Sequence, residues 1–340
     1  LCDLSVIKKL PVVVREGGWK VTATLLEDGE AIEITDVQPG DITKKRFGIA
    51  VDVGTTSIVV YLVDLVDARI VDVASSYNPQ MKYGDDVITR IVYATSKQNG
   101  LSVMKDLVIS NVNTLTEGIA KKNNIDLNLI DNIVIAGNTT MTHLFYGVNP
   151  QYIREEPYVP VANLFPLTKA KDIGIKVNEQ AVLYSLPSIA SYVGGDITSG
   201  VLASGMCRTK ELILFIDIGT NGEIVLGNCE WFITTACSAG PCFEGGGVKF
   251  GMRAMNGAIE QVTIDRETYE ASYKVIGSVK PTGICGSGMI DAIAEMFLSG
   301  VIDLRGKIQL DISSKRVRSG ENGPEYVLVW KEDAGLEQDI

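Results

Sequence analysis

Two copies of a short acidic motif carry the residues best suited to chemistry. Asp-Val-Gly-Thr begins at Asp52, and Asp-Ile-Gly-Thr begins at Asp217, 165 residues later. Each copy lies between two apolar, β-branched runs, a pattern that predicts a strand, a tight turn and a second strand. One such motif is weak evidence, whereas the repeat indicates duplicated subdomains that face one another.

Turns of this composition suit the phosphates of a nucleotide. Glycine lets an anion approach the backbone, and consecutive N–H groups in a turn form an anion-binding concavity. Threonine hydroxyls and an asparagine amide add donors, and a carboxylate at the strand end suits hydrated Mg²⁺. Two ordinary hairpins are the alternative, but they give no reason for an aspartate at the end of both strands. The predicted phosphate-binding residues are Gly54, Thr55, Thr56, Gly219, Thr220 and Asn221, with Asp52 and Asp217 as catalytic residues that hold Mg²⁺ through water.

Other polar residues stand where strands or loops meet helices. Asp86 and Asp196 are candidate catalytic residues that orient a water for attack on the γ-phosphate, or they are plain helix N-caps. Gly137-Asn138 precedes an apolar helix, where backbone donors favour anions. Gly286-Ser287-Gly288 begins another helix, and it either faces the nucleotide or packs closely on a sheet. The single histidine, His143, could serve as an acid–base group, but a structural or surface histidine is the favoured interpretation.

The elements that must position these residues follow an alternating α/β order. Apolar residues at helical spacing predict helices at 85–98, 102–122 and about 286–299, and an apolar run predicts a strand at 132–138. Residues 1–46 contain short β-rich runs and a polar joint. We therefore expect a small β-rich module and linker at 1–46, a first subdomain at 47–205, and a second, incomplete at its C-terminal end, at 206–340.

Composition narrows the class of protein. The 340 residues include 31 basic and 42 acidic side chains, a formal net charge of −11, which disfavours broad binding to nucleic acid or anionic lipid. No apolar run is long enough to span a membrane, so we expect a cytoplasmic protein. The six cysteines lack a C-x-x-C pair and are expected to be buried, reduced thiols, although Cys237 and Cys242 have the spacing that opens one iron–sulfur ligand set. Because the chain starts without Met, we expect a piece of a longer protein.

Six longer segments extend the two motifs: GIAVDVGTTSI (48–58), YNPQMKYGDDVITRI (77–91), IAGNTTMTHLFYG (135–147), DIGTNGEIVLGN (217–228), TTACSAGPCFEGGGVKFGMRA (234–254) and GICGSGMIDAIAEMF (283–297). Through these segments the sequence resembles the reductive activators of corrinoid proteins, within the actin/sugar kinase/heat-shock-protein ATPase superfamily. The segments occur in the family's order and cover most of residues 47–300, while residues 1–46 are similar to the small middle domain that precedes the family's ATPase domain.

The resemblance implies two ribonuclease H-like, actin-like ATPase subdomains around a nucleotide cleft. It implies that binding and hydrolysis of ATP with Mg²⁺ help return inactive cobalt(II) to cobalt(I) in a corrinoid protein of a methyl-transfer system. Electrons would come from a donor such as a ferredoxin or flavoprotein, through a [2Fe–2S] domain outside this chain. It also implies a homodimer, and a late glycine-rich turn beyond Ile340 that completes the adenosine site.

Three other activities fit the same superfamily. A small-molecule kinase would transfer phosphate to an acceptor without a corrinoid protein. An activator of a dehydratase-type enzyme would need cysteines at a dimer interface, which the Cys237/Cys242 pair does not clearly supply. A filament-forming, actin-like role is the least favoured, because the sequence shows no assembly feature.

Overall fold

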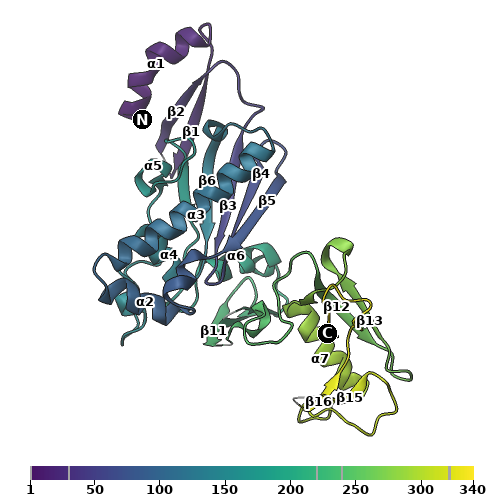
Figure 1. Cartoon of the computed structure of the whole chain (residues 1–340). Helices are drawn as coiled ribbons and strands as arrows, with labels where there is room; N and C mark the ends of the chain where they lie inside the picture. Colours follow the sequence, from purple (N-terminus) through teal and green to yellow (C-terminus); the bar gives the residue numbers. More distant parts are fainter. Residues whose placement is uncertain (1, 30, 220, 239, 321–322) are drawn as a thin grey trace. The chain divides into compact units, whose positions relative to one another are not determined.

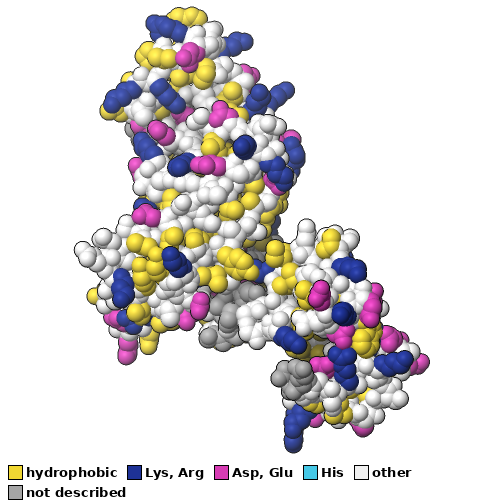
Figure 2. Space-filling view, in the orientation of Figure 1, with side chains coloured by type: hydrophobic (Ala, Val, Ile, Leu, Met, Phe, Trp, Pro, Cys, Tyr) yellow, Lys and Arg dark blue, Asp and Glu magenta, His cyan; other side chains and the backbone are white. Residues whose placement is uncertain are grey.

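The computed structural model describes residues 2–29, 31–219, 221–238, 240–320 and 323–340 (Figure 1). The chain forms two compact units. Unit 1 comprises Leu1–Ile216 and Glu223–Ala236, and unit 2 comprises Asp217–Gly222 and Cys237–Ile340. On the face shown in Figure 2, acidic and basic side chains are interspersed in each unit.

A six-stranded sheet is the centre of unit 1. Its order is β5-β4-β3-β6-β8-β7, in which β3 pairs antiparallel with β4 and parallel with β6, and β6 pairs parallel with β8. The antiparallel pairing of β3 with β4 confirms the predicted first hairpin. Ile49, Val51 and Val53 of β3 are buried, as expected for alternate residues of a half-buried strand. The strands are β3 (Phe47–Val53), β4 (Ser57–Asp64), β5 (Arg69–Tyr77), β6 (Ile130–Ala136), β7 (Thr168–Lys169) and β8 (Val182–Ser185).

Helices cover this sheet, and α3 crosses one of its faces (Figure 1). Val108 and Val112 of α3 belong to the same buried core as Ile49 and Val51 of β3. The predicted helices at 85–98 and 102–122 and the strand at 132–138 are confirmed. The helices of unit 1 after the first 46 residues are α2 (Val87–Ser96), α3 (Gly100–Lys122), α4 (Thr139–Tyr146), α5 (Ala170–Ile173) and α6 (Gly195–Ser204), with 3-10 turns at Pro79–Tyr83, Leu127–Leu129, Gln151–Ile153 and Met206–Arg208.

The N-terminal module contains a helix that the sequence interpretation missed. Helix α1 (Leu4–Glu16) precedes the hairpin of β1 (Val21–Asp28) and β2 (Ala31–Pro39). The valines at 12–14, interpreted as part of a β-rich run, lie in this helix. Val6 and Val13, seven residues apart, both pack against Val37 of β2. Burial of this helical face therefore outweighs the weak strand preference of consecutive valines.

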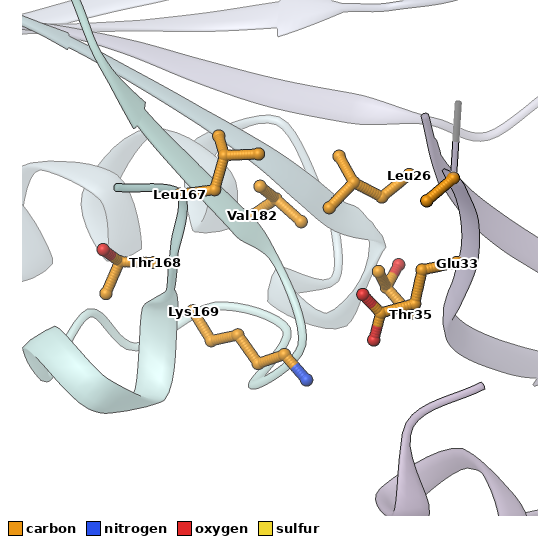
Figure 3. A pocket seen from close by; sticks show the side chains of 8 residues that line it. Leu26, Glu33, Thr35, Leu167, Thr168, Lys169 and Val182 are labelled. Carbon is orange, nitrogen blue, oxygen red and sulfur yellow. The ribbon is translucent and has the colours of Figure 1, made fainter. Parts of the chain in front are cut away.

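A buried carboxylate joins this module to the rest of unit 1. Asp36 is 2% exposed, forms an ion pair with Lys9, and accepts a hydrogen bond from Asn178 Nδ2 at 2.8 Å. Lys169 forms a second ion pair, with Asp3. Beside these contacts is a pocket of about 340 Å³, across which Lys169 and Glu33 point toward one another (Figure 3). The module is thus fastened through paired charges and polar contacts.

Removal of the Asp36 carboxylate is expected to destabilise unit 1. Asp36→Ala leaves the Lys9 ammonium and the buried Asn178 amide without their acceptor, so we expect the free energy of unfolding to fall by about 2–3 kcal/mol. Urea denaturation measures this loss. Asp67→Ala, which removes an exposed carboxylate with an exposed Arg69 partner, is the control and should change stability by less than about 1 kcal/mol. Equal effects of the two substitutions would contradict the prediction.

The second predicted hairpin is also present. Strands β9 (Ile213–Ile218), β10 (Asn221–Gly227) and β11 (Phe232–Ser238) form a sheet in the order β11-β10-β9. In unit 2, helix α7 (Gly286–Leu298) confirms the helix predicted at 286–299, and it packs against β12. The other elements of unit 2 are β12 (Ala258–Ile264), β13 (Ala271–Val275), β14 (Gly283–Ile284), β15 (Val317–Gly320) and β16 (Gly323–Tyr326), with 3-10 turns at Pro241–Glu244 and Ile276–Ser278. Among the described residues, no helix has the length and apolar character needed to cross a membrane.

Candidate functional site

The turn between β3 and β4 is held by a buried asparagine. Asn78 Nδ2 donates to the Gly54 carbonyl at 2.8 Å, and the Asn78 backbone N–H donates to the Thr56 carbonyl at 2.9 Å. A Cβ on Gly54 would lie 2.6 Å from the Ser57 carbonyl oxygen, so only glycine fits there. Asp52 is exposed near the end of β3, and Thr55 is 6% exposed. The turn therefore has a fixed shape.

The turn after β6 contacts the first one through a side-chain amide. Asn138 Oδ1 accepts from the Met141 N–H at 2.9 Å and so caps α4, while Asn138 Nδ2 donates to Thr55 Oγ1 at 2.9 Å. A Cβ on Gly137 would lie 2.7 Å from the Val53 carbonyl oxygen. The structure thus brings together two segments that the sequence predicted separately.

The start of α6 contacts the turn at residues 137–138. Gly195 N–H donates to the Gly137 carbonyl at 2.9 Å, and a Cβ on Gly194 would lie 2.4 Å from Asn138 Cα. Asp196 is half-buried in the first turn of α6, and its Oδ1 accepts from the Ile197 N–H at 2.8 Å. Since these segments follow the carboxyl ends of β3, β6 and β8, they occupy the edge where open parallel sheets bind ligands.

The two aspartates at helix starts have different places. Asp86 caps α2, because its side chain accepts from the Thr89 N–H at 2.7 Å and Thr89 Oγ1 bonds back to the cap. The N-cap interpretation is confirmed for Asp86. It is wrong for Asp196, since Gly194 is the N-cap of α6. Water orientation by either residue stays a prediction.

In unit 2, the described part of the second turn is tight. Gly219 N–H donates to the Asn221 carbonyl at 2.9 Å, whereas Thr220 lies outside the described residues. Burial raises the pKa of the half-buried Asp217 carboxyl above its ordinary value. A carboxylate in this environment gains from a nearby cation, which favours its charged form.

The glycines at the start of α7 have a packing role. A Cβ on Gly288 would lie 2.2 Å from the Ile259 carbonyl oxygen, and one on Gly286 would lie 2.6 Å from the Phe243 carbonyl oxygen. Ser287 Oγ donates to the Glu260 carbonyl at 3.0 Å. These contacts give the helix–sheet explanation a physical basis, and a role of the three residues in nucleotide binding stays a prediction.

Comparison with known proteins identifies the family. Three family models match successive parts of the chain: the RACo linker region at residues 1–44, the RACo middle region at 47–209, and the C-terminal domain of RACo, the ASKHA domain, at 211–340. A solved structure of a reductive activator for a corrinoid, iron–sulfur protein matches all of this chain and 54% of its own, with 44% identity and a TM-score of 0.91. The chain belongs to the RACo family.

Two curated proteins are similar to this RACo chain. The corrinoid activation enzyme RamQ of Eubacterium limosum is 34% identical over 96% of this chain and 55% of its own length. The [Co(II) methylated amine-specific corrinoid protein] reductase of Methanosarcina barkeri is 25% identical over 76% of this chain and 52% of its own. This chain therefore spans about half the length of the relatives it matches.

The comparisons confirm the family resemblance and the fold class, an α/β protein with an actin-like ATPase domain after a β-rich region. They give the name middle region to residues 47–209 of this RACo chain and the name linker region to residues 1–44, so the likeness of the first 46 residues to a middle domain is wrong. The predicted boundary at 205/206 stays a prediction.

The residue types in each of the two turns fit Mg²⁺ and phosphate by their chemistry. Aspartate carboxylates, threonine hydroxyls and an asparagine amide are hard oxygen ligands and polar donors, without a thiolate or imidazole in the two turns. Within the described ranges, no group of three or more His, Cys, Asp or Glu side chains is gathered as for a tightly held metal ion.

The histidine and the cysteines of this RACo chain differ in burial. His143 is buried, its Nδ1 lies 2.7 Å from the Thr139 carbonyl oxygen, and burial lowers its pKa, which confirms the structural interpretation. Of the cysteines, Cys285 alone is buried; Cys2, Cys229 and Cys237 are exposed and the other two are intermediate. The expectation of buried thiols is therefore wrong for five positions.

Sequence reasoning missed the residue that holds the first turn. Asn78 lies inside a segment that carried the family resemblance, yet nothing in its local pattern assigns it a role. It is fully buried, and it fixes a turn 24 residues earlier in the chain. The available signal was the Asn-Pro pair directly after a strand. This pair is equally typical of an ordinary turn.

Proposed function

We propose that this protein uses binding and hydrolysis of ATP to help return corrinoid cobalt(II) to cobalt(I). The observation that carries the proposal is the convergence of the Thr55, Asn138 and Gly195 segments at the carboxyl ends of parallel strands. The names of the relatives, which include a corrinoid activation enzyme and a cobalt(II) corrinoid protein reductase, support the choice of substrate.

Each residue of the site has a proposed task. Backbone N–H groups of Gly54, Thr55 and Thr56 bind phosphate oxygens, as do those of Gly219, Thr220 and Asn221, and Gly137-Asn138 positions the first turn. Asp52 and Asp217 hold the water shell of Mg²⁺, which when bound neutralises charge on the phosphate oxygens. Asp196, and less directly Asp86, orient the attacking water; Gly286, Ser287 and Gly288 lie toward the nucleotide. Because phosphoryl transfer depends mainly on alignment and charge stabilisation, this set suffices without a strong base.

ATP acts on the redox step through the protein's conformation. One electron converts cobalt(II) to cobalt(I), and water cleaves ATP to ADP and phosphate. A nucleotide shifts a conformational equilibrium only by binding one state more tightly. We propose a homodimer that receives electrons from a ferredoxin or flavoprotein through a [2Fe–2S] domain, and we propose subdomains at 47–205 and 206–340.

A coupled assay tests this function. With the complete gene product, a reductant and a cobalt(II) corrinoid protein, we expect cobalt(I) to accumulate only when Mg·ATP is present, as measured by its visible absorbance. Mg·ATP should also change the affinity for the corrinoid protein by about 5-fold or more, the usual size of coupling between two sites. Rapid phosphorylation of a metabolite, with no complex and no cobalt(I) for any corrinoid protein, would instead indicate a small-molecule kinase.

A further inference from the structure

A buried arginine is linked through other side chains to the predicted phosphate turn. Arg90 of α2 is 0% exposed. Its Nε donates to the Gly84 carbonyl at 2.9 Å, and its Nη1 lies 3.3 Å from both Gln80 Oε1 and Met141 Sδ. Among the described residues, Nη2 has no hydrogen-bond partner. The guanidinium is thus fixed in place with part of its donor capacity unused.

This arginine has no ion-pair partner at contact distance among the described residues. Burial lowers the pKa of Arg90 to about 10, and the exposed carboxylates of Asp85 and Asp86 partly oppose that shift, so the group is protonated at neutral pH. None of the ion pairs formed by the described residues includes Arg90. A buried cation without an ion-pair partner lowers the stability of the fold, and other interactions of the protein must offset this cost.

Hydrogen bonds connect Arg90 to the first turn. Gln80 Oε1 accepts from Arg90 Nη1 and from Asn78 Nδ2, at 3.3 and 3.5 Å, and Gln80 Nε2 donates to the Met104 carbonyl at 2.9 Å. The last bond fixes which way the Gln80 amide faces. Asn78 Nδ2 in turn donates to the Gly54 carbonyl. Arg90 is therefore connected, through Gln80 Oε1, to the Asn78 amide that holds the turn.

A second connection reaches the other turn. Met141 Sδ lies 3.3 Å from Arg90 Nη1 and 3.8 Å from Asn78 Nδ2, and the Met141 N–H donates to Asn138 Oδ1 at 2.9 Å. The same guanidinium thus supports both segments that meet at Thr55. The Asn78 amide lies between the two connections, because its Nδ2 contacts both the Gly54 carbonyl and Met141 Sδ.

We propose that Arg90 is a positioning residue whose buried positive charge and hydrogen bonds prepare the 54–56 and 137–138 turns for a multiply charged phosphate group. The proposal rests on the proposed function, because it takes these turns as the phosphate site. In the low dielectric of the interior, a fixed cation acts on an anion over several ångströms, whereas an exposed one is screened.

The test compares ligands of different charge. Arg90→Met keeps the length of the side chain but removes its charge and donors, and we expect the ratio of ATP to AMP affinity to fall about tenfold, because a fixed, buried positive charge near the added phosphates is lost. Arg90→Lys keeps the charge and should retain the ratio within about threefold. Lys97→Met, which removes an exposed charge at the other end of α2, is the matched control and should leave the ratio unchanged. Calorimetry on the complete gene product, with a melting curve for each variant, supplies these values.

The outcomes separate this inference from the function on which it rests. If the wild-type protein binds no ATP, the proposed function and the role of Arg90 both fail. If it binds ATP and Arg90→Met leaves the ATP to AMP ratio unchanged, only the role of Arg90 fails, and a lower melting temperature then shows a purely structural residue. Should Arg90→Met not fold, Arg90→Gln, which keeps amide donors without charge, carries the same comparison.

Discussion

Asp217→Asn is expected to stabilise the protein and at the same time to lower its ATPase rate about 10–100-fold. Burial raises the pKa of Asp217, so the folded protein holds its charged form at a cost, which the neutral amide avoids. The expected loss of ATPase rate is the size usually seen when a residue that orients the water ligands of a metal ion is removed. Phosphate release gives the rate, and thermal melting without Mg²⁺ gives the stability.

The dependence on pH follows from the direction of this shift. A carboxyl group whose folded pKa is raised contributes stability below its ordinary pKa near 3.8, and this contribution is lost as pH rises through the folded value. The gain from Asp217→Asn should therefore appear at neutral pH and vanish in acid. Asp52→Asn should reduce the rate by a similar factor, and Asp67→Asn, at an exposed position, serves as the control. Wild-type turnover in both Asp52→Asn and Asp217→Asn would rule out the proposed Mg²⁺ site.

Local patterns predicted the elements whose physics is local. The apolar, β-branched run that includes Ile49, Val51 and Val53 predicted a strand, and the apolar spacing along residues 102–122 predicted a helix, because each pattern reflects burial within its own segment. The run at 12–14 failed this reasoning. Val13 of this run is buried against Val37, which lies in strand β2 about 25 residues later. Only this tertiary contact decides that the run is helical.

The site was predicted in pieces for the same reason. Gly54, Thr55, Gly137 and Asn138 were each found from their own turn, but the bond between Thr55 and Asn138 joins residues 83 positions apart. Nothing near Arg90 in the sequence shows that its guanidinium is buried and contacts Gln80 and Met141. The requirement for glycine at Gly194 was equally hidden from the sequence. Its backbone dihedral angles suit any residue, and a side chain is excluded only because the 137–138 turn packs against it.

Gly194→Ala is expected to lower the ATPase rate about 100-fold, the effect of displacing a reacting group by about 1 Å. The added Cβ would lie 2.4 Å from Asn138 Cα and 2.6 Å from the Gly137 carbonyl oxygen. Both are backbone atoms, so neither can rotate away as a side chain would. The turn that holds Thr55 must move, and we expect the free energy of unfolding to fall by about 1–3 kcal/mol as well. Phosphate release and urea denaturation measure the two effects.

Gly118→Ala is the matched control, because the same substitution there meets no steric obstacle. Gly118 lies inside α3, and a Cβ on it would have no atom of another residue within 4 Å, apart from its chain neighbours and the helix's own nearby backbone. The unfolded chain loses less conformational entropy on folding with alanine than with glycine. The free energy of unfolding should therefore rise by about 0.5–1 kcal/mol, with the ATPase rate unchanged. If Gly194→Ala retains the wild-type rate while Gly118→Ala behaves as expected, the contact of α6 with the 137–138 turn does not position the phosphate site. If Gly194→Ala loses the rate but keeps most of its stability, the close approach of these two backbones serves the site more than the fold.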